Sequence, residues 1–88
     1  MPKMVITHKV VDVDRWLKGK AERVAASAPF GTNSTDYVAL DGSNNVAITV
    51  DIEDMAAAQA MMASPPPEVA AQAERHGVLP PLTTYIEK

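Results

Sequence analysis

The side chains best suited to chemistry in this chain are two neighbours near its start, His8 and Lys9. A histidine titrates near neutral pH, so His8 is the residue that we expect to act as a general acid or base. A lysine can hold an anionic or phenolic ligand, and Lys9 is our candidate for that contact. Each has a structural interpretation as well. His8 would then be a partly buried imidazole that donates to a backbone carbonyl, and Lys9 a charge at a pocket rim.

Four further residues are candidates for contact with a small ligand: Trp16, Tyr37, Thr49 and Tyr85. The turn-forming residues 41–45 predict a hairpin in which Tyr37 lies opposite Thr49. An aromatic ring and a hydroxyl would then share one patch. Trp16 could wall a pocket. The competing interpretations are cross-strand packing for the two tyrosines and a filled core or interface for the tryptophan.

Several kinds of site are excluded by the residues that the chain contains. It has two histidines, far apart in sequence, and no cysteine, so no zinc-binding spacing is present. The acidic pairs Asp12/Asp14 and Glu53/Asp54 fall where helices are expected to start, and His76 falls where a helix is expected to end. These positions explain them as capping residues. No glycine-rich phosphate-binding motif occurs. We therefore expect neither a metal nor a cofactor.

The elements that must position these residues follow from the hydrophobic periods of the chain. Alternating or β-branched runs predict strands, and apolar residues at helical spacing predict helices between them. In order, we expect a strand at Lys3–Val11, a helix at Val13–Ala28, a hairpin of Thr35–Leu40 and Asn45–Ile52, helices at Met55–Ala63 and Glu68–His76, and a strand at Leu82–Glu87. This βαββαβ order predicts a ferredoxin-like α+β domain that spans residues 1–88, with one four-stranded antiparallel sheet.

Strict alternation assigns the strand residues to two faces of the predicted sheet. We place one set, which includes His8, against the helices: Met4, Ile6, Val10, Val38, Leu40, Val46, Ile48, Val50, Leu82 and Ile86. The opposite face then carries small, hydroxylic and aromatic residues: Val5, Thr7, Lys9, Tyr37, Ala39, Ala47, Thr49, Asp51, Thr83 and Tyr85. A solvated face usually carries more charge, so this composition favours cover by a second copy.

Composition and charge limit the partners and the compartment that we expect for the protein. The net charge is −3 and no basic stripe is interleaved with aromatic residues, so we expect no nucleic-acid partner. No apolar run approaches the ~20 residues of a membrane span, and the first residues lack the features of a signal peptide. The absence of cysteine fits a reducing compartment. We therefore expect a cytoplasmic protein without a membrane partner.

Three segments resemble small stand-alone proteins of the dimeric α+β barrel group, whose best-known relatives are the antibiotic-biosynthesis monooxygenase-like domains. They are residues 8–12 followed by Trp16, residues 54–58 leading to residues 63–65, and Gly77-Val78 before the last strand. The resemblance covers nearly the whole chain. It implies a homodimer in which two sheets pack into a barrel, often with a pocket beside or inside it. The group includes cofactor-free quinol oxygenases, haem-degrading enzymes, isomerases and cyclases, so the resemblance does not choose a reaction.

The functional expectation is a protein that binds or transforms a hydrophobic phenolic or quinone-like compound without a metal. If it is an enzyme, His8 transfers the proton, while Tyr37, Tyr85 and Thr49 position the ligand through their hydroxyls. A cofactor-free oxygenase of this kind deprotonates its substrate and lets the carbanion meet oxygen. Two alternatives stay open: a non-catalytic homodimeric binding or regulatory module, and a proton-transfer isomerase or cyclase.

Overall fold

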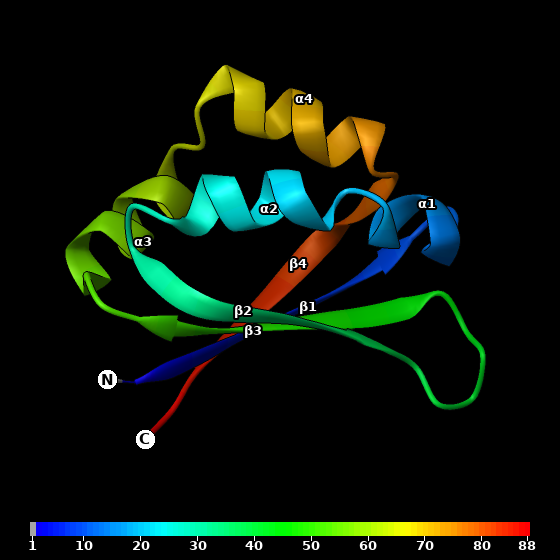
Figure 1. The fold of residues 1–88 in the computed structure, drawn as a ribbon, viewed down its shortest axis with the longest axis horizontal. Coiled ribbons are helices and arrows are strands. Elements are labelled where there is room, and N and C mark those ends of the chain that lie inside the picture. The colour runs from blue at the N-terminus through cyan, green and yellow to red at the C-terminus, as the bar shows by residue number, and fades with distance from the viewer. Residues whose placement is uncertain (1) are drawn as a thin grey trace.

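A computed structural model describes residues 2–88 and shows four helices over one face of a four-stranded sheet (Figure 1). The strands are antiparallel and lie in the order β2-β3-β1-β4. This confirms the ferredoxin-like α+β prediction. The elements in chain order are β1 (Lys3–Val10), α1 (Val13–Leu17), α2 (Lys20–Ser27), β2 (Gly31–Val38), β3 (Asn45–Ile52), α3 (Met55–Ala63), α4 (Pro67–Arg75) and β4 (Val78–Ile86).

Strand β1 lies in the middle of the sheet and carries the first candidate residue. It pairs with β3 in continuous register, so that His8 lies opposite Val46. Its pairing with β4 shifts between Thr7 and Lys9, and His8 falls at that irregularity. A bulge of this kind redirects a side chain relative to its neighbours. The local backbone therefore singles out His8 within an otherwise regular strand.

The core lies between the sheet and the helices and consists of two clusters of buried side chains. At one end, Met4, Val50 and Ile52 pack against Ala58 of α3. At the other end, Val10 and Val46 pack against Trp16 of α1. The alternation of β1 and β3 supplies these contacts, because every second residue points to the helices. Trp16, whose side chain is fully buried, anchors the end near His8.

The prediction of one continuous helix over Val13–Ala28 is wrong. The helix breaks at Lys18 and Gly19, and α2 starts after Gly19. A Cβ at position 19 would overlap the ring of His76, so glycine makes room there for the imidazole. The break also changes which side of the helical segment faces the sheet. As a result Leu17 and Val24, two apolar residues at helical spacing in the predicted helix, are exposed.

The edge strands differ from prediction in length and in burial. β2 begins at Gly31 rather than at Thr35, and β4 begins at Val78 rather than at Leu82. Four residues expected against the helices are exposed instead: Val38, Leu40, Leu82 and Ile86. Leu40 lies beyond the end of β2 in the hairpin loop, which projects away from the helices (Figure 1), and the other three lie on the edge strands β2 and β4. Alternation predicts a face only where another layer covers it.

Within residues 2–88, no helix is both long enough and apolar enough to cross a lipid bilayer.

Candidate functional site

His8 points to the helix side of the sheet, as alternation predicted, and its residue is only 7% exposed. The edge of its ring meets Trp16, with 5.8 Å between the ring centroids. Nδ1 lies 3.0 Å from the carbonyl oxygen of Lys9. Because a carbonyl can only accept, Nδ1 carries the proton of the neutral ring, and Nε2 is left with a free lone pair.

Burial lowers the pKa of the His8 imidazole, and the positive charge of Arg23 lowers it further, while the hydrogen bond to Lys9 raises it. The lowered pKa keeps the ring neutral at neutral pH. A neutral imidazole with a free Nε2 is the form that accepts a proton. The geometry therefore suits His8 to act as a general base.

The imidazole borders a cavity of about 180 Å³ between the sheet and helices α2 and α4, which we call the interlayer cavity. An apolar cavity of about 150 Å³ suffices to hold benzene, so one substituted ring is the size that fits here. Most of the walls are apolar, and three of the lining side chains are aromatic or imidazole rings: His8, Phe30 and His76. The lining residues are Ile6, His8, Arg23, Ala26, Ser27, Phe30, Ser34, Ile48, Val50, Met61, Val69, Gln72, Ala73, His76, Val78 and Leu82.

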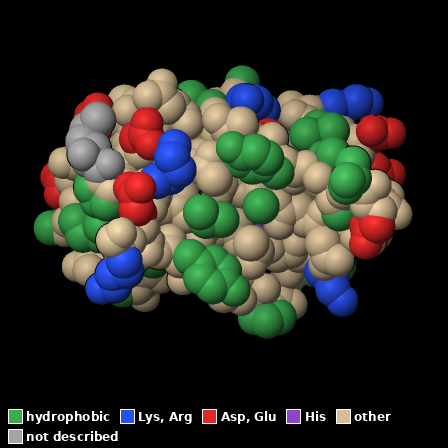
Figure 2. Space-filling view, turned by 90° about the horizontal axis from the view of Figure 1, so that it is seen from below, with side chains coloured by type: hydrophobic (Ala, Val, Ile, Leu, Met, Phe, Trp, Pro, Cys, Tyr) green, Lys and Arg blue, Asp and Glu red, His purple; other side chains and the backbone are tan. Residues whose placement is uncertain are grey.

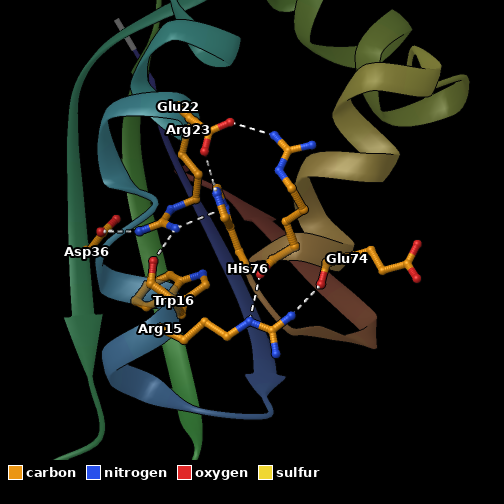
Figure 3. A network of polar contacts seen from close by, with 8 residues as sticks. Arg15, Trp16, Glu22, Arg23, Asp36, Glu74 and His76 are labelled. Atoms are coloured by element: carbon orange, nitrogen blue, oxygen red, sulfur yellow. Dashed lines mark hydrogen bonds and ion pairs between the residues drawn. The ribbon is translucent and has the colours of Figure 1, made fainter.

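Arg23 of α2 brings a buried positive charge to this cavity. Its guanidinium carbon lies 4.2 Å from the centre of the Trp16 ring, and Nη2 donates to Oδ2 of Asp36 at 2.6 Å. The Arg23 and Asp36 side chains are 11% and 5% exposed. A buried ion pair of this kind fixes the orientation of both groups, and removal of one partner leaves the other charge uncompensated. Figure 3 shows Arg23 between Trp16 and His76.

His76 caps the C-terminus of α4 and is buried against α2. Nε2 lies 3.2 Å from a carboxylate oxygen of Glu22, and Nδ1 lies 3.4 Å from Nη1 of Arg23. Glu22 can only accept and Arg23 can only donate, so these partners match a neutral ring with its proton on Nε2. Hydrogen bonds from His76 and from Arg75 lower the pKa of the Glu22 carboxyl.

Arg15 ties the first helix to the same helix end. Its Nε donates to the carbonyl oxygen of Arg75 at 2.7 Å, and its Nη2 donates to that of Glu74 at 3.0 Å (Figure 3). These carbonyls belong to the last turn of α4, where a cation is favoured by the helix dipole. The contacts of Arg15 and His76 therefore hold α1, α2 and α4 together at the polar end of the cavity.

Three buried polar atoms around Arg23 lack a hydrogen-bond partner among residues 2–88: Trp16 Nε1, Arg23 Nε and Asp36 Oδ1. Buried polar groups in proteins are nearly always satisfied, so each exception needs an explanation. All three belong to the Trp16–Arg23–Asp36 contact set. Of these three residues, Arg23 borders the interlayer cavity, so the unused donor of its guanidinium lies beside that cavity.

A second and larger hollow lies on the other face of the sheet. Its volume is about 600 Å³ and it opens to the surface; we call it the sheet hollow. Figure 2 shows this face, with apolar side chains in its middle and most charges toward its two ends. The lining residues are Thr7, His8, Lys9, Tyr37, Val38, Ala39, Asn45, Val46, Ala47, Leu79, Pro80, Pro81 and Thr83.

The structure divides the six sequence-predicted site residues among three places. His8 borders both hollows, whereas Lys9 and Tyr37 border only the sheet hollow. The predicted register is wrong, because Tyr37 lies opposite Ala47 and Thr49 lies opposite Thr35. Thr49 still donates to the hydroxyl of Tyr37 at 3.2 Å, so an aromatic ring and a hydroxyl do share one patch. Tyr85 lies opposite Val5 on β4 and is exposed. Trp16 lies in the core beneath His8 and Arg23 and borders neither hollow.

Sequence reasoning missed Arg23 and Asp36. An arginine on a helix and an aspartate in an edge strand are usually solvent-exposed. Two signals were present: Gly19 interrupts the helical pattern, and Asp36 falls between Ser34 and Val38, on the side of β2 that alternation assigns to the helices. A charge in that position needs a buried partner of opposite sign.

By sequence, no family model matches the chain, and no curated protein matches it at a significant level. Solved structures do match it. An antibiotic biosynthesis monooxygenase aligns over 100% of this chain and 97% of its own, with 15% identity and a TM-score of 0.68. SnoaB, a cofactor-independent oxygenase from Streptomyces nogalater, aligns over 99% of this chain and 90% of its own, with 18% identity and a TM-score of 0.69. The fold is that of the antibiotic biosynthesis monooxygenase-like proteins.

Protein Atu4242 from Agrobacterium tumefaciens also matches in structure. It has 13% identity and a TM-score of 0.66, and the alignment covers 100% of this chain and 92% of its own. These similarities extend over the whole chain, so they confirm the resemblance seen in the sequence at the level of fold. At such low identity they carry no assignment of a reaction.

Proposed function

We propose that the protein binds a small phenolic or quinone-like compound in the interlayer cavity and exchanges a proton with it through His8, without a metal. The observation that carries this proposal is the state of His8. Its Nδ1 is engaged by the carbonyl of Lys9, its Nε2 is free, and its ring borders a cavity with mostly apolar walls. A neutral base beside a cavity with mostly apolar walls is the minimum that such chemistry requires.

The volume of the interlayer cavity favours a ligand with a single ring over a polycyclic one. Apolar walls from Phe30, Ile48 and Met61 would hold the ring, and the polar end with His8 would receive the hydroxyl. A proton moves from the ligand hydroxyl to Nε2 of His8. The resulting phenolate or hydroquinone anion is electron-rich and is the form that would react with dioxygen in an oxygenase.

A thermal-stability screen tests the binding step. The panel contains single-ring phenols and hydroquinones, two-ring naphthols, and benzoates as anionic controls. A ligand at 100 times its Kd adds about 2.7 kcal/mol, which raises the Tm of a domain of this size by several degrees. We expect the single-ring phenols to shift the Tm of the wild type. A variant that fills the cavity, Ala73→Leu, should lose the shift, and Tyr37→Ala should keep it. A shift lost in Tyr37→Ala instead would assign the ligand to the sheet hollow.

Turnover assays with and without dioxygen then separate the remaining alternatives. Loss of the phenol only in the presence of dioxygen supports an oxygenase, and turnover in its absence supports a proton-transfer isomerase or cyclase. Both should be lost in His8→Gln. Binding without turnover under either condition would support the non-catalytic binding module.

We also propose that a second copy of the chain covers the open sheet face. The aromatic rings of Tyr37 and Tyr85 are exposed to solvent in the single chain. Charges lie mostly toward the ends of that face (Figure 2). A second sheet packed there would bury these rings and close the sheet hollow, in which Lys9 and Tyr37 would then face any enclosed ligand. Native mass measured across a dilution series tests the dimer.

A further inference from the structure

We propose that Arg23 determines which ligands the interlayer cavity accepts, by stabilising the ionised oxygen of an acidic phenol. This inference rests on the proposed function and adds to it a specificity-determining residue. It assigns the ligand class as phenols whose hydroxyl loses its proton readily. Neutral aromatic compounds of the same shape would bind more weakly.

The first support is position. The titratable or charged side chains that border the cavity are His8 of β1, Arg23 of α2 and His76 after α4. His8 and Arg23 both contact Trp16, at 5.8 Å and 4.2 Å, so they lie at the same end of the cavity. A ligand oxygen at Nε2 of His8 would therefore lie at the same end of the cavity as the guanidinium.

The second support is unused hydrogen-bonding capacity. A guanidinium has five N–H groups. Those of Arg23 meet the carbonyl oxygen of Trp16, Nδ1 of His76 and Oδ2 of Asp36, which accounts for three. The Nε–H group is buried and has no acceptor among residues 2–88. An anionic oxygen from a ligand is the acceptor that this cationic donor lacks, and a small displacement of the side chain would present it.

The third support is the chemistry of the proton transfer. The O–H bond of the phenol breaks, its electron pair stays on the oxygen, and a new N–H bond forms at Nε2 of His8. A phenolate and an imidazolium result from two neutral groups, so the total charge is unchanged. A fixed positive charge beside the oxygen favours the phenolate, and most strongly where water is excluded. Arg23 is fixed by stacking on Trp16 and by its bond to Asp36.

Two carboxylates near Arg23 oppose its positive charge. Asp36 lies on the guanidinium and offsets part of its charge, and Glu22 reaches the cluster through His76. This arrangement makes a prediction that a purely structural ion pair does not make. Removal of the Asp36 charge should strengthen the binding of a phenolate, whereas removal of the Arg23 charge should weaken it.

The test uses 4-nitrophenol, whose phenolate absorbs at longer wavelength than the phenol, and 4-nitroanisole, which cannot ionise. Binding and spectra are measured at the pH at which free 4-nitrophenol is half ionised. The proteins are the wild type, Asp36→Asn, and the double variant Arg23→Gln with Asp36→Asn, in which no buried charge is left unpaired. Lys20→Gln, on the exposed side of the same helix, removes an equal charge outside the cavity and is the matched control.

We expect the wild type and the control to bind 4-nitrophenol mainly as the phenolate and at least about tenfold more tightly than 4-nitroanisole. The double variant should lose that preference and bind the neutral phenol, and Asp36→Asn should increase the ionised fraction. Equal binding of both probes by the wild type, with spectra unchanged in the double variant, would overturn the role of Arg23 while the cavity and its ligand class stand. Failure of both probes to bind would overturn this inference together with the proposed function.

Discussion

The two faces of the sheet each have a hollow beside His8, and the two hollows differ in almost every physical property. The interlayer cavity is small, bordered by helices, and contains a buried guanidinium paired with a buried carboxylate. The sheet hollow is more than three times larger, open, and bordered by exposed residues such as Lys9 and Tyr37. Its polar groups can still exchange hydrogen bonds with water.

The comparison shows how burial assigns different tasks to similar residues. An arginine in the open hollow would be screened by solvent and would contribute little to binding. In the interlayer cavity, burial lowers the pKa of His8, and the charge of Arg23, which Asp36 partly offsets, lowers it further. The covered face therefore suits the proposed proton chemistry, and the open face suits the proposed association.

The largest effect should follow from breaking the buried ion pair. Arg23→Ala leaves the Asp36 carboxylate buried without a partner and removes the cation stacked on Trp16. We expect a loss of about 3–5 kcal/mol in the free energy of unfolding. Urea unfolding followed by circular dichroism measures it. Lys20→Ala on the same helix should change that free energy by less than about 0.5 kcal/mol, and an equally small effect of Arg23→Ala would mean that the pair is not buried in solution.

A charge introduced on the open face should weaken the proposed dimer and leave the fold of the single chain intact. Tyr37→Asp places a carboxylate on the surface that we propose to be covered, and it should weaken the dimer by about 2 kcal/mol or more, roughly a 30-fold rise in Kd. Sedimentation at several concentrations measures the change. Thr49→Asp should act in the same direction and Lys20→Ala should have no effect. A wild type that is monomeric at all concentrations would contradict the proposal that the open face mediates association.

The break between α1 and α2 offers a test of how tightly the covered face is packed. Gly19→Ala places a methyl group against the His76 ring, and we expect a loss of about 1–3 kcal/mol in the free energy of unfolding. In a His76→Ala background the same substitution should cost nothing further, because the obstructing ring is gone. Chemical unfolding of the four proteins of this cycle gives the coupling. A coupling of zero would show that the ring does not lie over Gly19.

The smallest effect should be a dependence of stability on pH that arises from His8. Its pKa is lowered in the folded chain from an ordinary value of 6.5, so the unfolded chain takes up the proton first as the pH falls. Its contribution to stability is therefore complete above about pH 6.5 and is lost as the pH falls from there through the lower folded value. Unfolding measured between pH 8 and pH 5 should show a shallower decline in His8→Gln than in the wild type. Identical slopes would indicate that the imidazole is solvated.

The strands and their order along the chain could be predicted because their signals are local. The strict alternation of Val46, Ile48 and Val50 identifies β3 and its buried face, and the turn residues that precede it identify the hairpin. The side of His8 follows from the same rule. Each of these inferences needs only neighbours within a few positions.

The polar end of the cavity could not be predicted in this way, because it joins residues that are distant in the chain. Arg23 is buried only because Asp36 and Trp16 meet it, and Gly19 breaks the helix only because His76 lies over it. Helical periodicity ranks residues by hydrophobicity, so it favours Val24 over Arg23 for a place in the core. In the structure Arg23 is buried against Asp36 and Val24 is exposed.

One detail of the last strand limits how copies of this chain can meet. Strand β4 is an edge of the sheet and runs through Pro80 and Pro81. Proline has no amide hydrogen to donate, so a foreign strand that approaches this edge finds a gap in the hydrogen-bonding ladder. Such prolines protect a sheet against indefinite extension into aggregates. This edge therefore discourages growth strand by strand, which agrees with the proposed stacking of whole sheets, an association that closes after two copies.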